Sequence, residues 1–193
     1  MKLYFLQHPR YSYEGFVVPL RRQNPFRFHP VVHLMDDCAW LKSMLASELE
    51  VRPPMSDRRE EKALAGECSK VYHDGKLIAF AERRKVGSHV EISTVLVDDK
   101  HRGKGVGKKL ILEALAEINA TLVLCCTKNP AMAAVLQSQG FTSIGWPGAS
   151  TAIGLTVNTV LRMCSMLIRF EIKRIWVQGK GIHKYERYQF VRD

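Results

Sequence analysis

The sequence is short of acidic residues and of paired cysteines. Its 193 residues hold 19 Asp and Glu against 29 Lys and Arg, a formal net charge of +10. This imbalance favours anionic partners, such as phosphorylated ligands, nucleic acid or acidic surfaces. The five cysteines form no C-x-x-C pair, which argues against a disulfide framework and against a zinc site. We therefore expect reduced thiols, no bound metal and a cytoplasmic protein.

Long uninterrupted apolar runs are also missing. The apolar stretch at the N-terminus is too short for a signal peptide. The most apolar segment, 152–168, is interrupted by Asn158 and Arg162, so it is predicted to be a buried or half-buried helix, and no membrane partner is expected. The length fits one domain. We expect a single domain over residues 1–193, with a basic N-terminal segment (1–35) and a C-terminal elaboration (147–193).

The positive charge is concentrated at the two ends of the chain. Residues 1–35 carry a net charge of +4 and residues 150–193 carry +5, whereas residues 36–70 carry −2. Nucleic acid is one partner that such ends could bind. A solvated basic surface explains the same charges without nucleic acid, and we favour that interpretation.

Apolar periodicity and turn residues predict alternating helices and strands. Helices are expected over residues 36–49, 56–66, 105–119 and 129–139, and strands over 68–73, 76–84, 89–97, 121–126 and 141–144. Prolines in residues 1–35 exclude a long helix there. Beyond Trp146, residues 155–170 suit a helix or a strand, and strands are expected over 173–178 and 184–191. This order predicts a mixed α/β layer fold.

The segment 95–110 is the most informative part of the chain. A predicted strand ends at Val97, and a helix starts within a glycine-rich turn that holds Gly103, Gly105 and Gly107. The first N–H groups of a helix lack partners inside the helix and carry its positive dipole end. Glycines let a phosphate approach the backbone. The turn therefore predicts an anion site, most plausibly for a pyrophosphate.

Two widespread phosphate-binding patterns do not fit this turn. The Walker pattern requires Ser or Thr after Gly-Lys, but Lys109 follows Gly107-Lys108. The dinucleotide pattern G-x-G-x-x-G fails because the glycines are spaced G-x-G-x-G. A turn that merely starts a helix is the simpler alternative.

Two motifs together resemble one family. Arg102-x-x-Gly105-x-Gly107, after a hydrophobic strand, resembles the Q/R-x-x-G-x-G/A signature for acetyl-CoA in the GNAT superfamily (GCN5-related N-acetyltransferases). Further along, the segment from Asn129 to Gly140-Phe141 resembles the family's Asn-led helix that ends in Gly-Phe. The resemblance covers residues 36–145.

The resemblance implies a fold, a reaction and a binding site. The fold would be a mostly antiparallel sheet, splayed at strand 89–97, with helices on both faces. Acetyl-CoA would lie between the splayed strands as co-substrate, and an amine acceptor would attack its thioester directly. Asn129 would contact the cofactor or cap its helix. The implied cofactor-binding residues are Val95, Leu96, Val97, Arg102, Gly103, Lys104, Gly105, Val106, Gly107, Lys108 and Asn129.

The resemblance also suggests catalytic groups. Glu91 matches the position of the general base in GCN5-like histone acetyltransferases; an ordinary ion-paired glutamate is the alternative. Many members carry a tyrosine as general acid where this chain has Leu136. The acid is therefore absent, replaced by water or supplied from elsewhere, and Tyr185 and Tyr188 are candidates for the last case. The thiols of Cys125 and Cys126 could in principle carry an acyl group, but buried-strand cysteines usually serve packing.

Family resemblance leaves the acceptor open. A protein lysine or α-amine is one class, and a small amine is another; a cationic small amine would suit the acidic segment 36–70. An RNA-borne amine, as in aminoacyl-tRNA, would use the basic ends. A non-catalytic CoA-binding module is a further alternative. The C-terminal segment could cover the acceptor site or form a homodimer.

Overall fold

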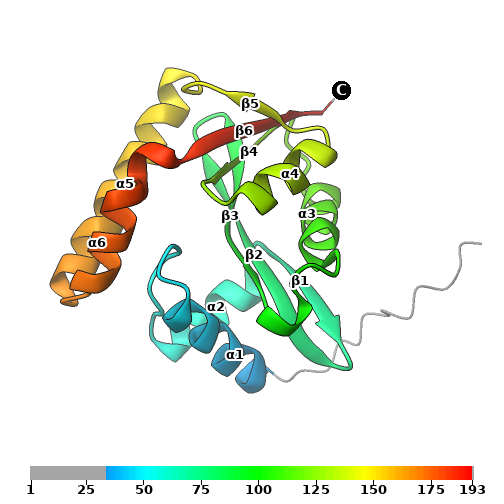
Figure 1. The fold of residues 1–193 in the computed structure, drawn as a ribbon, viewed down its shortest axis with the longest axis vertical. Helices are drawn as coiled ribbons and strands as arrows, with labels where there is room; N and C mark the ends of the chain where they lie inside the picture. Colours follow the sequence, from blue (N-terminus) through cyan, green and yellow to red (C-terminus); the bar gives the residue numbers. More distant parts are fainter. Residues whose placement is uncertain (1–33, 193) are drawn as a thin grey trace, which may run out of the picture.

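A six-stranded sheet forms the centre of the computed structural model, which describes residues 34–192 (Figure 1). Its strand order is β1-β2-β3-β4-β6-β5, and β3 and β4 are the parallel pair. The strands are β1 (Cys68–His73), β2 (Lys76–Val86), β3 (His89–Val97), β4 (Leu122–Thr127), β5 (Thr142–Ile144) and β6 (Glu186–Val191). The last strand in sequence thus lies inside the sheet, between β4 and β5.

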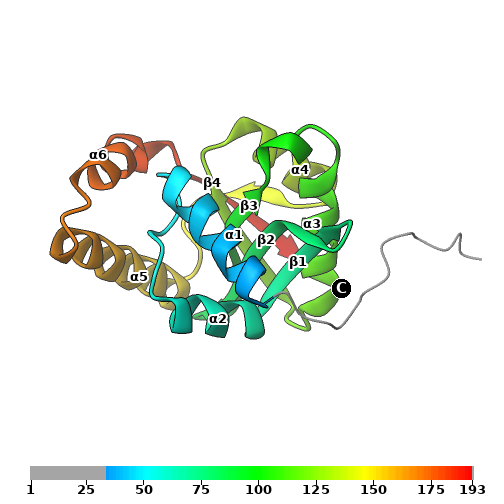
Figure 2. The same ribbon diagram turned by 90° about the horizontal axis from the view of Figure 1, so that it is seen from below.

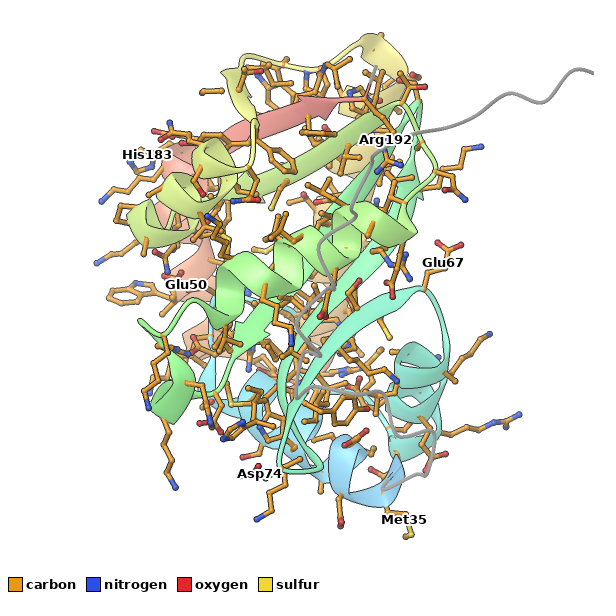
Figure 3. The ribbon with its side chains drawn as sticks, turned by 90° about the vertical axis from the view of Figure 1, so that its right-hand side faces the viewer. Met35, Glu50, Glu67, Asp74, His183 and Arg192 are labelled. Carbon is orange, nitrogen blue, oxygen red and sulfur yellow. The ribbon has the colours of Figure 1, made fainter. Side chains whose placement is uncertain are left out.

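Helices cover both faces of the sheet, as the resemblance implied (Figure 2). One face is covered by α1 (Leu34–Ser47) and α2 (Asp57–Ala65), and the other by α3 (Val106–Glu117) and α4 (Pro130–Ser138). Two short 3-10 helices are η1 (Asp99–His101) and η2 (Ile182–Lys184). In Figure 3, α3 runs across the sheet in front of the viewer, with Asp74 at the tip of the β1–β2 hairpin.

Strand β2 supplies side chains to both hydrophobic cores. Ala79 and Ala81 belong to the core under α3, whereas Phe80 belongs to the core under α1 and α2, and all three are fully buried. This alternation is what a strand covered on both faces requires. The turn before β2 uses Asp74 and Gly75 at positive φ (49° and 73°), as a two-residue hairpin turn does.

Strand β3 contains a bulge at its middle. Glu82 pairs with Ser93 and Phe80 pairs with Leu96, so one residue of β2 faces two of β3. Within the bulge Thr94 has φ 51° and donates a hydrogen bond to Glu82 (2.8 Å). Bulges bend a strand. Pairing of β3 with β4 is limited to residues 90–92 against 123–125, and the two strands diverge beyond it.

A helical hairpin stands beside the sheet at the left of Figure 1. It consists of α5 (Ala149–Ile168) and α6 (Ile172–Gly181). The predicted strand 173–178 is therefore wrong, because this segment lies in α6. Its buried polar residues Arg174 and Gln178 are spaced i, i+4, which places them on one helix face, and this spacing overrides the β-branched composition.

Helix α6 holds the α1–α2 loop in place. The Arg174 guanidinium donates to the carbonyls of Leu45 (2.8 Å) and Glu48 (2.7 Å) at the end of α1. Gln178 donates to the carbonyl of Leu49 (2.9 Å). Carbonyls at a helix C-terminus have no partners within the helix, so these bonds stabilise the end of α1 and connect the C-terminal hairpin to the N-terminal half.

Helix α5 presents its apolar side to the outside. It is long and apolar enough to cross a membrane by length and composition, and 11% of that apolar window is buried among the described residues. Its polar residues Asn158 and Arg162 instead face inward and line a cleft. We call the exposed apolar side chains the outer stripe: Ile153, Val157, Val160, Leu161, Leu167 and Ile168. Val160 lies at the margin of the stripe and also lines the cleft.

Candidate active site

A cleft of about 1220 Å³ opens where β3 and β4 diverge. One wall, the glycine side, is formed by residues 95–97, the turn 102–108 and the start of α4. The opposite wall, the hairpin side, is formed by Glu48, residues 50–52, Glu82, Arg84 and Glu91, and by residues of α5, α6 and β6. In Figure 3, Glu50 and His183, which both line this wall, lie at the same edge of the molecule.

The glycine side owes its shape to two backbone positions. Gly103 and Gly105 have φ of 73° and 79°, a left-handed conformation that other residues adopt only at a cost. Gly105 is the N-cap of α3, so the first amides of that helix point into the turn. At Gly107 a Cβ would lie 3.9 Å from a Val97 methyl carbon, which is an ordinary van der Waals contact. The shape of the turn therefore depends on Gly103 and Gly105 and not on Gly107.

Ten of the twelve residues expected from the sequence line the cleft. They are Glu91, Val95, Leu96, Val97, Arg102, Gly103, Gly105, Gly107, Lys108 and Asn129. Lys104 is exposed and Val106 packs against the core under α3, and neither lines the cleft. Asn129 caps α4, because its Oδ1 accepts the Ala131 N–H at 2.9 Å, and it also lines the cleft; its contact with the cofactor stays a prediction.

Arg102 is held by neighbouring acceptors. Its guanidinium donates to the Val97 carbonyl (3.1 Å) and pairs with Asp99 (3.0 Å) and with Glu48. These contacts connect the end of β3 with the end of α1. The Arg102 side chain thus braces the glycine turn against the hairpin side.

Glu91 lies at the point where β3 and β4 begin to diverge. It pairs in register with Leu124 of β4, and its side chain is 7% exposed. Arg84 Nε donates to Glu91 Oε2 at 2.8 Å, whereas Oε1 has no hydrogen bond to another described residue. A nearly buried carboxylate held by one oxygen can accept a proton with the other.

The candidate acyl-carrying cysteines are poor nucleophiles here. Burial raises the pKa of Cys126 to about 12, and it raises the pKa of the fully enclosed Cys125 further. The thiolate is the nucleophilic form of cysteine, and both side chains are protonated at neutral pH. The packing interpretation of these residues is supported.

The two tyrosine candidates for a general acid, and the Leu136 position that lacks one, differ clearly in their surroundings. Leu136 is fully buried in the core under α3, and Tyr188 is also buried and donates to Glu186. Tyr185 lines the cleft, and its hydroxyl donates to the Glu50 carbonyl at 3.4 Å. Burial raises the pKa of Tyr185 above its ordinary value, although Lys128 opposes the shift, so the hydroxyl keeps its proton at neutral pH.

Sequence reasoning missed most of the hairpin side. The acidic segment 36–70 suggested a negative wall, but its cleft-lining carboxylates have basic partners: Glu48 pairs with Arg102, and Glu50 pairs with Lys128 (2.8 Å). Arg52 makes a bidentate contact with the buried Glu60 (2.9 and 2.7 Å). No sequence motif marks the Glu48–Arg102 and Glu50–Lys128 pairs, because their partners are far apart along the chain.

A match to a protein-family model identifies the family to which this cleft and fold belong. The model for the acetyltransferase (GNAT) family matches residues 33–141, which is more than half of the chain. The chain belongs to the GNAT family. It is accordingly an N-acetyltransferase that uses acetyl-CoA as its acetyl donor. Among the described residues no cluster of His, Cys, Asp or Glu side chains could hold a metal ion.

Solved structures share the fold at low sequence identity. Rv2747 from Mycobacterium tuberculosis, solved with CoA and NLQ, aligns with a TM-score of 0.55 at 17% identity over 81% of this chain and 95% of its own. A ribosomal-protein-alanine N-acetyltransferase from Brucella melitensis gives 0.55 at 15% identity over 83% and 97%.

A third similar structure belongs to a larger protein. N-acetylglutamate synthase from Neisseria gonorrhoeae, solved with coenzyme A and N-acetyl-glutamate, gives a TM-score of 0.53 at 15% identity over 80% of this chain and 32% of its own. No curated protein matches the sequence. At these identities, the structural similarities establish the fold of this chain.

Proposed function

We propose that this GNAT protein acetylates a primary amine of a protein or of a small molecule by direct attack on acetyl-CoA. One observation carries the proposal: a glycine turn, an opened strand edge and a nearly buried glutamate all line one cleft. Each supplies a different requirement of the reaction, namely phosphate binding, thioester alignment and proton removal.

The glycine side fits acetyl-CoA. The amides of residues 103–108 would hold the pyrophosphate, since helix N-termini bind phosphate well. Beyond Ile92, β3 has lost β4 as its partner, so backbone groups near Val95, Leu96 and Val97 are available to the pantetheine arm. The cofactor supplies an acetyl thioester at the end of that arm.

Glu91 would act as the general base. An alkyl ammonium has a pKa of about 10.4 and must lose a proton before it can attack. Glu91 Oε1 takes that proton directly or through water, while Arg84 orients the carboxylate. The neutral amine nitrogen then bonds to the thioester carbonyl carbon, and the carbon–sulfur bond breaks with its electron pair leaving on the CoA sulfur. The excess proton on the new amide nitrogen is lost and replaces the proton that Tyr185 gives to the thiolate.

Tyr185 would return a proton to the departing thiolate. It is the tyrosine of the two C-terminal candidates that lines the cleft, and its raised pKa keeps the hydroxyl protonated. This role takes the place of the tyrosine that other family members carry at the position of Leu136.

The decisive experiment compares the wild type with Glu91→Gln. The substitution is expected to lower kcat for amine acetylation by roughly 10²- to 10⁴-fold and to leave the Kd of acetyl-CoA unchanged. The matched control is Glu113→Gln, a half-buried glutamate on α3 outside the cleft. Unchanged activity from pH 6 to 9 would remove Glu91 from the mechanism.

The same assay tests the competing function. A non-catalytic module would bind acetyl-CoA, measured by calorimetry, yet acetylate no member of a broad panel of amines, peptides and aminoacyl-tRNA. Turnover with any free or peptide amine excludes that alternative.

A further inference from the structure

Among the residues that line the cleft, basic side chains outnumber carboxylates. Four carboxylates line the cleft, and each has a basic partner: Glu48 with Arg102, Glu50 with Lys128, Glu82 with Arg52, and Glu91 with Arg84. The remaining cations on the hairpin side therefore have no ion-paired carboxylate among residues 34–192.

Arg162 and Arg187 are these remaining arginines. Arg162 projects inward from α5, and its Nε is inaccessible to solvent and has no hydrogen-bond partner among the described residues. Arg187 of β6 stacks on Trp146, with its guanidinium carbon 3.8 Å from the ring centroid, and makes no ion pair within residues 34–192.

Arg162 lines the same cleft as Glu91 and Tyr185, the two residues proposed to move protons. Burial lowers the pKa of Arg162, and Tyr185, Arg84 and Glu91 lie close enough to influence it as well. A buried cation without a partner is costly, and a planar guanidinium fits a carboxylate through two parallel hydrogen bonds. Arg162 thus presents a half-buried guanidinium whose Nε has no partner among the described residues, on the wall that also holds Glu91.

We propose that the acetyl acceptor carries a carboxylate close to its amine and that Arg162 binds this carboxylate, with Arg187 as the second cation. The inference rests on the proposed function and narrows its substrate class. It disfavours polyamines and other purely cationic acceptors, because two unpaired arginines would repel them.

Two sources share this chemistry, and the test separates them. One is a free amino acid, and the other is a peptide with an acidic residue next to its terminal or lysine amine. Each carboxylate acceptor is assayed beside its neutral counterpart, an amino acid against the decarboxylated amine and an acidic peptide against its amide. The wild type should prefer the carboxylate form in kcat/KM by roughly 10- to 100-fold.

The variant Arg162→Gln should remove this preference. We expect KM to rise for carboxylate acceptors alone, with kcat nearly unchanged and with acetyl-CoA affinity intact. Arg58→Gln, at an exposed arginine on α2, is the control and should behave as the wild type. Equal losses for both acceptor forms, or a wild type without preference, would overturn the proposal.

A binding measurement keeps this inference separate from the proposed function. N-acetyl amino acids, or acetylated acidic peptides, are titrated by calorimetry into protein loaded with CoA. Binding that Arg162→Gln abolishes and Glu91→Gln preserves supports the carboxylate site even if no amine is turned over. Absence of such binding, together with turnover of neutral amines, refutes the site and leaves the enzyme function standing.

A second inference comes from the outer stripe of α5. Four of its residues, Ile153, Val157, Val160 and Leu167, together with the exposed Cys164, follow a 4-3-4-3 spacing, which is typical of helices that pack against each other. The outer stripe contains no charged residue, and the exposed fractions of its six apolar side chains lie between 49% and 78%.

We infer that the outer stripe pairs with the same stripe of a second copy. Six apolar side chains present on the order of 100 Å² each, so two facing copies would bury at most about 1,200 Å², which is the lower end of the range for stable interfaces. A membrane surface fits less well because, of the two arginines Arg162 and Arg169, the first faces the cleft and the second lies past the end of α5.

Sedimentation velocity tests this pairing. The wild type should be dimeric at micromolar concentration, Leu161→Asp should be monomeric and folded, and Leu112→Asp, at an exposed leucine on α3, should remain dimeric. A monomeric wild type refutes the inference. So does flotation of the wild type, but not of Leu161→Asp, with phosphatidylcholine–phosphatidylglycerol vesicles, because the stripe would then contact lipid.

Discussion

On the glycine side of the cleft, a strand, a turn and a helix start follow one another along the chain, whereas the hairpin side gathers residues from both halves of the protein. The glycine side offers mainly backbone groups, shaped by Gly103 and Gly105. The hairpin side offers side chains, most of them in ion pairs. The two walls should therefore respond differently to substitution.

The largest effect should come from the ion pairs that support the hairpin side. Glu60 is fully buried, accepts two hydrogen bonds from Arg52 and also accepts the Met55 N–H (2.6 Å). Glu60→Ala leaves Arg52 short of a partner and should lower the free energy of unfolding by about 3–5 kcal/mol, measured by urea denaturation.

The neighbouring Glu61→Ala is its control. Glu61 is only half-buried, so the loss should stay near 0.5 kcal/mol. Similar values for the two variants would mean that the hairpin side does not depend on this pair.

A backbone change should affect the glycine side through binding rather than stability. Gly105→Val forces a β-branched residue to φ 79°, where an L-residue pays about 1–2 kcal/mol, and it shifts the amides of the turn. We expect acetyl-CoA affinity to fall roughly 10-fold, by calorimetry. Gly75→Val, at φ 73° in the β1–β2 turn, should reduce stability and leave affinity intact.

A smaller effect is expected from the proton donor on the hairpin side. Tyr185→Phe should lower kcat by about 10-fold. Because the pKa of Tyr185 is raised, its hydroxyl stays protonated below pH 9, and the ratio of wild-type to variant kcat should be constant from pH 7 to 9. Tyr188→Phe, in the core, should alter stability alone; a loss of kcat there would reverse the assignment.

The thiols at the bottom of the cleft should show no effect. With a pKa of about 12, roughly one Cys126 side chain in 10⁴ is a thiolate at pH 8. Iodoacetamide at pH 8 should therefore leave Cys125 and Cys126 unmodified in the folded protein and modify both in urea, as mass spectrometry would show. Rapid labelling in the folded state would support a mechanism in which one of these cysteines carries the acetyl group.

The glycine side could be predicted because its determinants are local. The glycines, the capping Asn129 and strand 89–97 lie in continuous segments, and the structure places them as expected. The hairpin side depends on contacts between distant residues, such as Arg174 with the end of α1. Local composition misassigned residues 173–178 for the same reason: the partners that favour a helix there lie outside the segment.

Strands β3 and β4 meet over only three residue pairs, and this short seam joins β1–β3 to β4–β6. A molecule bound between the diverging strands would contact both parts and hold them together where the strands themselves do not pair. Binding of acetyl-CoA would then stabilise the contact between the two parts of the sheet, in addition to supplying the acetyl group. Amide hydrogen exchange should consequently slow on both strands, far from the thioester, when CoA is present.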